Sequence, residues 1–271
     1  MIGEKRSGII GKIIIGLTLF FLYVPIFIMM VFSFNDKRSL SVWGGFSFKW
    51  YTKLFNGRQM MEVVINTFTV AIIATILAVI IGTITAIGLS RSRKVIRNIV
   101  LNISDLPMIN PDIVTAIGLM LLFSSFGLNK GFVTVLLAHT IFCIPYVILS
   151  VLPKIRSLDN NLVDAAMDLG ATPWQALVRV ILPQLKSGII AGALIAFTMS
   201  FDDYVITYFV TGNGFKNISI LVSTMGRRTN PSVNALSTIF VLVITVGLVL
   251  YNLVPVVSKK KKGRLRWKKL W

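Results

Sequence analysis

This 271-residue chain is poor in the side chains on which soluble enzymes depend. It has one cysteine, one histidine and ten acidic residues, and only 14% of its residues are charged, whereas 55% are hydrophobic. A soluble domain carries about a quarter charged residues, so this composition excludes a soluble enzyme and a disordered chain. A single cysteine also excludes a disulfide scaffold. We interpret Cys143 and His139 as packing residues without chemistry.

Long apolar stretches take up most of the remaining sequence. Six of them exceed the roughly 20 residues that a helix needs to cross a bilayer. They lie at about residues 13–34, 63–90, 99–125, 131–152, 187–211 and 232–257. Helices are expected because lipid offers no partner for backbone polar groups. The sequence therefore predicts an all-α polytopic membrane protein with six transmembrane helices and one transmembrane domain over residues 1–271.

The basic residues predict the orientation. If the N-terminus is cytoplasmic, 19 of the 28 Lys and Arg residues lie inside, eight of them in the basic tail at residues 259–271. The positive-inside rule then places both termini in the cytoplasm. We interpret the tail as a topology signal, with an anchor for anionic lipid as the alternative. The net charge of +18 thus needs no nucleic acid.

Two sequence patterns predict how the helices pack and bend. Small residues at four-residue spacing let membrane helices approach closely; they are Ala74, Ala78, Gly82 and Ala86 in the second span and Gly188, Gly192 and Ala196 in the fifth. Pro107 and Pro111 interrupt the third span, and the carbonyls they free favour a place on a central pathway. Outside the membrane, Ser47 is expected to cap a short helix over Phe48–Phe55.

The one long polar stretch, a cytoplasmic loop at residues 153–185, carries its own helix signals. A helix is expected over Asn161–Leu169, followed by Gly170 in the left-handed position beyond a helix end. Thr172 is suited to cap a second helix, which we expect to stop before Pro183. A loop of this length with capped helices favours a docking element for a cytoplasmic partner over a plain surface hairpin.

Acidic residues interrupt two of the apolar spans. Asp112 and the pair Asp202–Asp203 would lie about 22 Å beyond the cytoplasmic edge of straight helices. Charged groups at such depth are costly and usually mark a pathway or a partner. Adjacent residues differ by about 100° around a helix, so at most one of the pair faces a shared cavity. We interpret these acids as a site for a cationic solute, with cation–π contact from Trp50 or Tyr204. The alternative is pairing with basic residues.

The cytoplasmic loop resembles the EAA loop of ABC importer permeases, whose pattern is EAA-x3-G-x9-I-x-LP. The matching positions are Asp164, Ala165, Ala166, Gly170, Leu182 and Pro183. Asp164 stands for the usual Glu, and Val180 for the usual Ile. The resemblance implies the type I importer permease architecture. It also implies that this loop is the coupling element that sits on an ATP-hydrolysing subunit.

The segments FSFKWYTKLF, NPDIV, DAAMDLGA and TMSFDDYV extend the resemblance to permeases of spermidine/putrescine ABC importers. Positions implicated there in polyamine transport fall on Trp50, Asp112, Ser200, Asp202 and Asp203. The resemblance implies a transport subunit of the bacterial inner membrane, not an enzyme. No cofactor is expected in this chain, because it has no phosphate-binding GxxxxGK[ST] motif; ATP and magnesium belong to a partner.

The implied partners are a dimer of ATP-binding subunits, a second permease, an extracellular polyamine-binding protein and the lipid bilayer. One alternative is an ABC permease for another cationic or small organic solute. Another is an ion-coupled secondary transporter, against which stands the lack of an evident repeated half. An intramembrane enzyme is disfavoured, since the sequence has no HExxH motif and no nucleophilic serine in a Gly-rich elbow.

Overall fold

The computed structural model describes residues 9–39, 41–159, 161–212, 214–224, 231–246 and residue 249. The chain divides into two compact units, one of residues 1–61 with 225–271 and one of residues 62–224, and each is described by itself. Within the described ranges the regular elements are helices, apart from one isolated β-bridge between Asn35 and Phe46.

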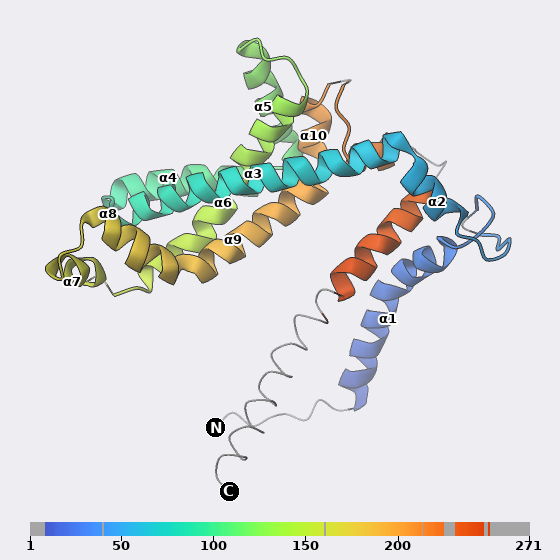
Figure 1. Cartoon of the computed structure of the whole chain (residues 1–271), viewed down its shortest axis with the longest axis horizontal. Coiled ribbons are helices and arrows are strands. Elements are labelled where there is room, and N and C mark those ends of the chain that lie inside the picture. The colour runs from blue at the N-terminus through green and yellow to red at the C-terminus, as the bar shows by residue number, and fades with distance from the viewer. Residues whose placement is uncertain are drawn as a thin grey trace, which may run out of the picture. The chain divides into compact units, whose positions relative to one another are not determined.

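The first unit contains α1 (Ile9–Phe32), α2 (Lys49–Asn56), the start of α3 (Arg58–Arg91) and a helix at Pro231–Val246. The second unit contains the rest of α3, α4 (Lys94–Ile109), α5 (Asp112–Ser125), α6 (Phe132–Arg156), α7 (Leu162–Asp168), α8 (Pro173–Ala176), the π-helical turn η1 (Leu177–Ile181), α9 (Leu182–Asp202), α10 (Val205–Val210) and α11 (Ile218–Thr224). Figure 1 labels α1 to α10 along the chain.

Among the residues that the structure describes, four helices are long and apolar enough to cross a membrane, namely Gly11–Phe32, Arg58–Arg91, Phe132–Arg156 and Pro173–Asp202. The bent pair α4–α5 makes a fifth candidate span. The prediction of an all-α polytopic membrane protein is confirmed. The last predicted span is described only as far as residues 231–246 and 249, and the basic tail at 259–271 lies outside the described residues. The count of six spans and the location of the termini therefore stay predictions.

The third predicted span bends sharply. α4 and α5 meet at an angle of 110°, with Asn110 in an extended conformation before Pro111. Proline disfavours the helical conformation in the residue before it, so α4 ends there although Pro107 lies inside it. Asp112 is the first residue after this bend, so α4 alone determines its distance from Arg97 and α5 then leaves in a new direction; the predicted depth of Asp112 in the membrane stays a prediction.

The fifth predicted span differs at both ends. The helix does not stop before Pro183; it runs from Pro173 through η1 into α9. Pro183 occupies the first turn of α9, where a missing backbone N–H costs little. At the other end α9 stops at Asp202, Asp203 is extended, and α10 begins at Val205. The span is thus broken beside its two acids.

The core of the second unit is built on α6, which lies between α3 and α9 (Figure 1). The predicted stripes of small residues face it. A Cβ on Gly192 would lie 3.1 Å from Cα of Val147, and one on Gly82 would lie 2.8 Å from Cβ of the same valine. Cys143 is fully buried, and its thiol donates to the carbonyl of Ala196 on α9. Close backbone approach therefore holds α3, α6 and α9 together, as the stripes predicted.

Candidate functional site

The loop at residues 153–185, which the sequence predicts to be cytoplasmic, folds from local signals. α7 covers the first predicted helix, and Gly170 follows it with φ +87°, in the left-handed region. Thr172 then caps α8 reciprocally with Gln175: the Gln175 N–H donates to Oγ1 of Thr172 at 3.3 Å, and the Thr172 N–H donates to Oε1 of Gln175 at 3.0 Å. The predicted helix, turn and cap are confirmed.

This loop exposes large apolar side chains. Leu169 is 90% exposed and Trp174 is 71% exposed, and Met167 is also exposed. The resemblance positions Asp164 and Ala165 on α7 are exposed as well. Apolar groups that face water beside polar ones are typical of a protein–protein contact surface. Of the remaining predicted coupling positions, Ala166 lies on α7 and Gly170 lies between α7 and α8, whereas Leu182 and Pro183 begin the long helix α9.

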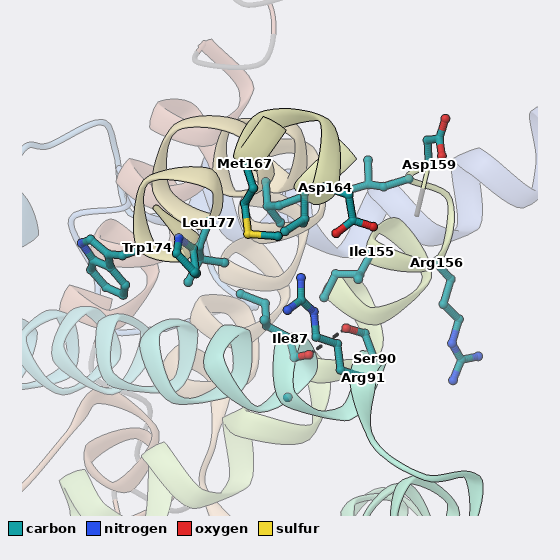
Figure 2. A pocket seen from close by; sticks show the side chains of 15 residues that line it. Ile87, Ser90, Arg91, Ile155, Arg156, Asp159, Asp164, Met167, Trp174 and Leu177 are labelled. Carbon is teal, nitrogen blue, oxygen red and sulfur yellow. Dashed lines mark hydrogen bonds between the residues drawn. The ribbon is translucent and has the colours of Figure 1, made fainter. Parts of the chain in front are cut away.

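A cavity of about 880 Å³ lies between the loop and the ends of α3 and α6. Figure 2 shows Arg91 of α3 and Asp164 of α7 turned toward this cavity, with Met167 and Leu177 on its loop side. No ion pair joins Arg91 to Asp164 in the described part of the chain. An open cavity therefore separates this part of the loop from the ends of α3 and α6.

A second polar site lies at the break between α9 and α10. Asp203 is the residue at the break, and its side chain is 7% exposed. Its carboxylate accepts from the backbone N–H of Ile206 at 3.2 Å and of Thr207 at 2.8 Å, and from the Thr207 hydroxyl at 2.8 Å. Asp203 thus satisfies the free N–H groups at the start of α10.

Buried polar side chains from other elements complete this cluster. His139 of α6 reaches Ser200 on α9 and Thr207 on α10 with its two ring nitrogens. Asn217, just before α11, donates to the carbonyl of Asp203 and to the Thr207 hydroxyl, and accepts from the N–H of Ile220. The cluster therefore links four helices by hydrogen bonds in the apolar interior.

The other two predicted pathway acids have different surroundings. Asp202 ends α9 and Asp112 begins α5, and both are exposed. Neither forms an ion pair with a residue of the described ranges. The helices that follow the two breaks, α5 and α10, pack against each other (Figure 1). The structure thus brings together two interrupted spans that each carry an acid at the interruption.

Trp50 belongs to the first unit and is buried. Its indole N–H donates to the carbonyl of Asn35 at 2.6 Å, and the ammonium groups of Lys49 and Lys53 lie 5.5 and 5.7 Å from its ring centroid. α2 begins one residue later than predicted, with the Ser47 hydroxyl accepting from the N–H of Lys49. The face of Trp50 is therefore already in contact with cations of its own helix.

Sequence reasoning missed part of the buried cluster. His139 was interpreted as a packing residue, and neither Thr207 nor Asn217 was selected. The partners of the buried acid were not selected either: Asp203 bonds to Thr207 and lies 3.4 Å from His139. The sequence signal for this cluster was a single histidine in an apolar span. A buried imidazole requires polar partners on both nitrogens, so such a histidine indicates further polar side chains around it.

A bundle of broken apolar helices with a capped, exposed loop is the architecture expected of a membrane transport subunit. The model of the family described as "Binding-protein-dependent transport system inner membrane component" matches residues 78–262. The chain belongs to this family. It is therefore the inner-membrane permease subunit of a bacterial ABC importer and not an enzyme.

Curated relatives match over most of the chain. The spermidine/putrescine permease PotC of Haemophilus influenzae is 37% identical over 235 residues, which cover 86% of this chain and 91% of the relative. PotC of Escherichia coli is 35% identical over 244 residues, covering 90% and 92%. The putrescine permease PotI of Escherichia coli is 36% identical over 262 residues, covering 94% and 92%.

Solved structures show the same fold at lower identity. A bacterial ABC transporter for the import of alginate matches with a TM-score of 0.65 at 18% identity, covering 91% of this chain and 94% of that chain. An amino acid ABC transporter with histidines matches with a TM-score of 0.53 at 23% identity, covering 74% and 92%. These likenesses extend the type I importer resemblance to the three-dimensional fold.

Proposed function

We propose that this chain is the permease of a polyamine importer that carries spermidine, putrescine or both. The observation that carries the proposal is the pair of exposed acids, Asp112 and Asp202, at the interruptions of two apolar spans. An acid without a counter-charge at such a position is costly unless it serves a pathway. Identities of 35–37% to spermidine/putrescine permeases support the choice of cation.

The polyamine ammonium groups are suited to these carboxylates. Asp112 stands in the first turn of α5, and Asp202 stands at the end of α9. A flexible cation with two or more charges can contact one carboxylate before it leaves the other. Its ammonium groups therefore keep a carboxylate contact while they lose their water. Since α5 and α10 pack together, a movement of one broken span is transmitted to the other.

We propose that ATP drives this movement through the cytoplasmic loop. Leu169 and Trp174 would be covered by a dimer of ATP-binding subunits, which hold ATP and magnesium. A second permease would complete the pathway, and an extracellular polyamine-binding protein would deliver the cation. The cation and ATP must each bind the inward-facing and outward-facing states with different affinity, because only differential binding shifts the balance between two states.

Uptake measurements test the polyamine assignment. The complete importer in liposomes is expected to accumulate labelled spermidine or putrescine upon addition of ATP. Asp112→Asn and Asp202→Asn should each reduce uptake by about tenfold or more, since each removes one charge contact to the cation. Asp36→Asn is the matched control, because Asp36 is an exposed acid outside the spans whose ion pair with Lys49 is solvent-accessible.

Three outcomes contradict the proposal. Normal polyamine uptake by both Asp112→Asn and Asp202→Asn rejects the site. Failure of excess spermidine and putrescine to compete with the transported solute rejects the substrate class, and favours an importer for a different solute. Transport without ATP would favour an ion-coupled transporter instead.

A further inference from the structure

One buried histidine joins the segments that meet at the break between α9 and α10. His139 is 2% exposed. Its Nδ1 lies 2.7 Å from Oγ of Ser200 on α9, and its Nε2 lies 2.9 Å from Oγ1 of Thr207 on α10. Oδ2 of Asp203, at the break itself, lies 3.4 Å from the same Nε2. The imidazole therefore contacts both sides of the break from a third helix.

The bonds around Thr207 determine which nitrogen of His139 carries a hydrogen. Thr207 has one hydroxyl hydrogen, which it donates to the Asp203 carboxylate at 2.8 Å. The Thr207 oxygen can then only accept, so Nε2 of His139 must donate to it. Nδ1 accepts from the Ser200 hydroxyl in the neutral imidazole and donates to it in the imidazolium. In both states the Nε2–H points toward Thr207 and Asp203.

This geometry separates the two adjacent acids. The carboxylate of Asp203 is held against the start of α10 by the N–H groups of Ile206 and Thr207 and by the Thr207 hydroxyl that His139 orients. Asp202 ends α9 and is exposed.

We propose that His139 is a positioning residue of the cation pathway. By holding the Asp203 carboxylate at the start of α10, it leaves Asp202 as the acid of the pair that contacts the transported cation. Asp203 and Ser200 then serve the pathway indirectly, as parts of the frame around His139. This inference rests on the proposed polyamine function, because it assigns a role to a residue of that pathway.

Coupling efficiency tests the positioning role. The readout is the number of spermidine molecules imported per ATP hydrolysed by the complete importer in liposomes, because a merely structural defect lowers both rates together. His139→Gln places an amide N–H near the position of Nε2, whereas His139→Asn places its amide near Nδ1. We expect His139→Gln to stay within about twofold of wild type and His139→Asn to fall about fivefold or more, since it leaves Thr207 without that donor.

Cys143→Ala is the matched control for this pair. Cys143 lies one turn further along α6, is fully buried, and donates to the carbonyl of Ala196 on α9 at 3.3 Å. Its removal disturbs the same helix interface without touching Asp203, and the ratio should stay at the wild-type value. A wild-type ratio in His139→Asn, or an equal fall in Cys143→Ala, overturns the proposal.

Thiol labelling tests the same proposal without reference to the cargo. Asp202→Cys and Asp203→Cys, each with Cys143→Ala, are treated with a positively charged methanethiosulfonate in the complete importer. Asp202→Cys should react about tenfold faster, because reactivity follows exposure. Addition of His139→Asn should reduce that difference to about threefold or less.

Equal rates for the two cysteine variants in the presence of His139, or an unchanged difference after its replacement, reject the positioning role. If the wild-type importer carries no polyamine, the proposed function fails, and the labelling rates still decide whether His139 holds position 203 away from the pathway. The two failures are thus distinguishable.

Discussion

The cytoplasmic loop and the break after α9 distribute polarity in opposite ways. In the loop, Leu169 and Trp174 turn large apolar surfaces to water. At the break, His139, Asp203 and Thr207 are polar side chains in an apolar interior. Exposed apolar surface is stabilised only when something covers it, whereas buried polar groups are stable only when they satisfy one another. We therefore infer that the loop needs a partner to cover its apolar side chains, whereas the buried polar groups at the break satisfy one another within this chain.

The two regions are the ends of one helical run. α8, η1 and α9 form a continuous element over Pro173–Asp202. At 1.5 Å per residue such an element spans about 45 Å. If the loop docks as proposed, a displacement there is transmitted along this helix to the acids. The π-helical turn η1 interrupts the α-helical bonding of this connection, and such turns are frequent at functional sites.

The largest expected effect comes from the docking surface. Leu169→Asp should weaken association with the ATP-binding subunits by about thirtyfold or more, which is about 2 kcal/mol, because a charge replaces an exposed apolar contact at an interface. Thermal stability of the isolated permease should stay unchanged, since Leu169 is 90% exposed. Binding of purified ATPase to the permease in detergent measures the effect.

Leu169→Met is the control for that variant, because it keeps an apolar side chain of similar volume and should bind almost normally. If Leu169→Asp binds as wild type does, the loop is not the docking surface and the contrast between the two regions disappears. If it unfolds the permease, the loop is part of the core after all.

The break should respond in the opposite manner. Thr207→Val keeps the shape of the side chain but removes the hydroxyl that joins His139, Asp203 and Asn217, and should lower the free energy of unfolding by about 1–3 kcal/mol. Thr198→Val removes a hydroxyl that bonds only to its own helix, and should change stability by less than about 0.5 kcal/mol. Thermal unfolding of the purified permease measures both. Equal stabilities would show that the buried cluster contributes nothing.

The loop was predictable from sequence because its signals are local. Gly170 at a helix end, Thr172 before Pro173, and the spacing of Asp164 act within a few residues of each other, so they do not depend on the rest of the fold. The stripes of small residues were predictable for a related reason: Gly192 needs only a neighbouring helix, and any bundle supplies one. The apolar spans followed from length and composition alone.

The break was not predictable, because its partners are far apart in the chain. His139 meets Ser200 and Thr207 across more than 60 residues, and periodicity within one span carries no information about such contacts. The 110° bend at Pro111 shows a second limit. A proline indicates that a helix is interrupted, but the direction of the following helix depends on α10, against which α5 packs.

The smallest expected effect concerns the backbone conformation of one loop residue and its influence on ATPase binding. Gly170 has φ +87°, and an L-residue with a Cβ is destabilised there by about 1 kcal/mol or slightly more. Gly170→Ala should therefore weaken ATPase binding by about fivefold, whereas Gly170→Asn should weaken it less, because asparagine tolerates the left-handed conformation. Apart from the two adjacent residues of the chain, no described residue has an atom within 4 Å of the added Cβ, so the difference in binding measures backbone conformation and not crowding. Equal binding by the two variants would mean that the turn rearranges on docking and that the free loop is not the bound one.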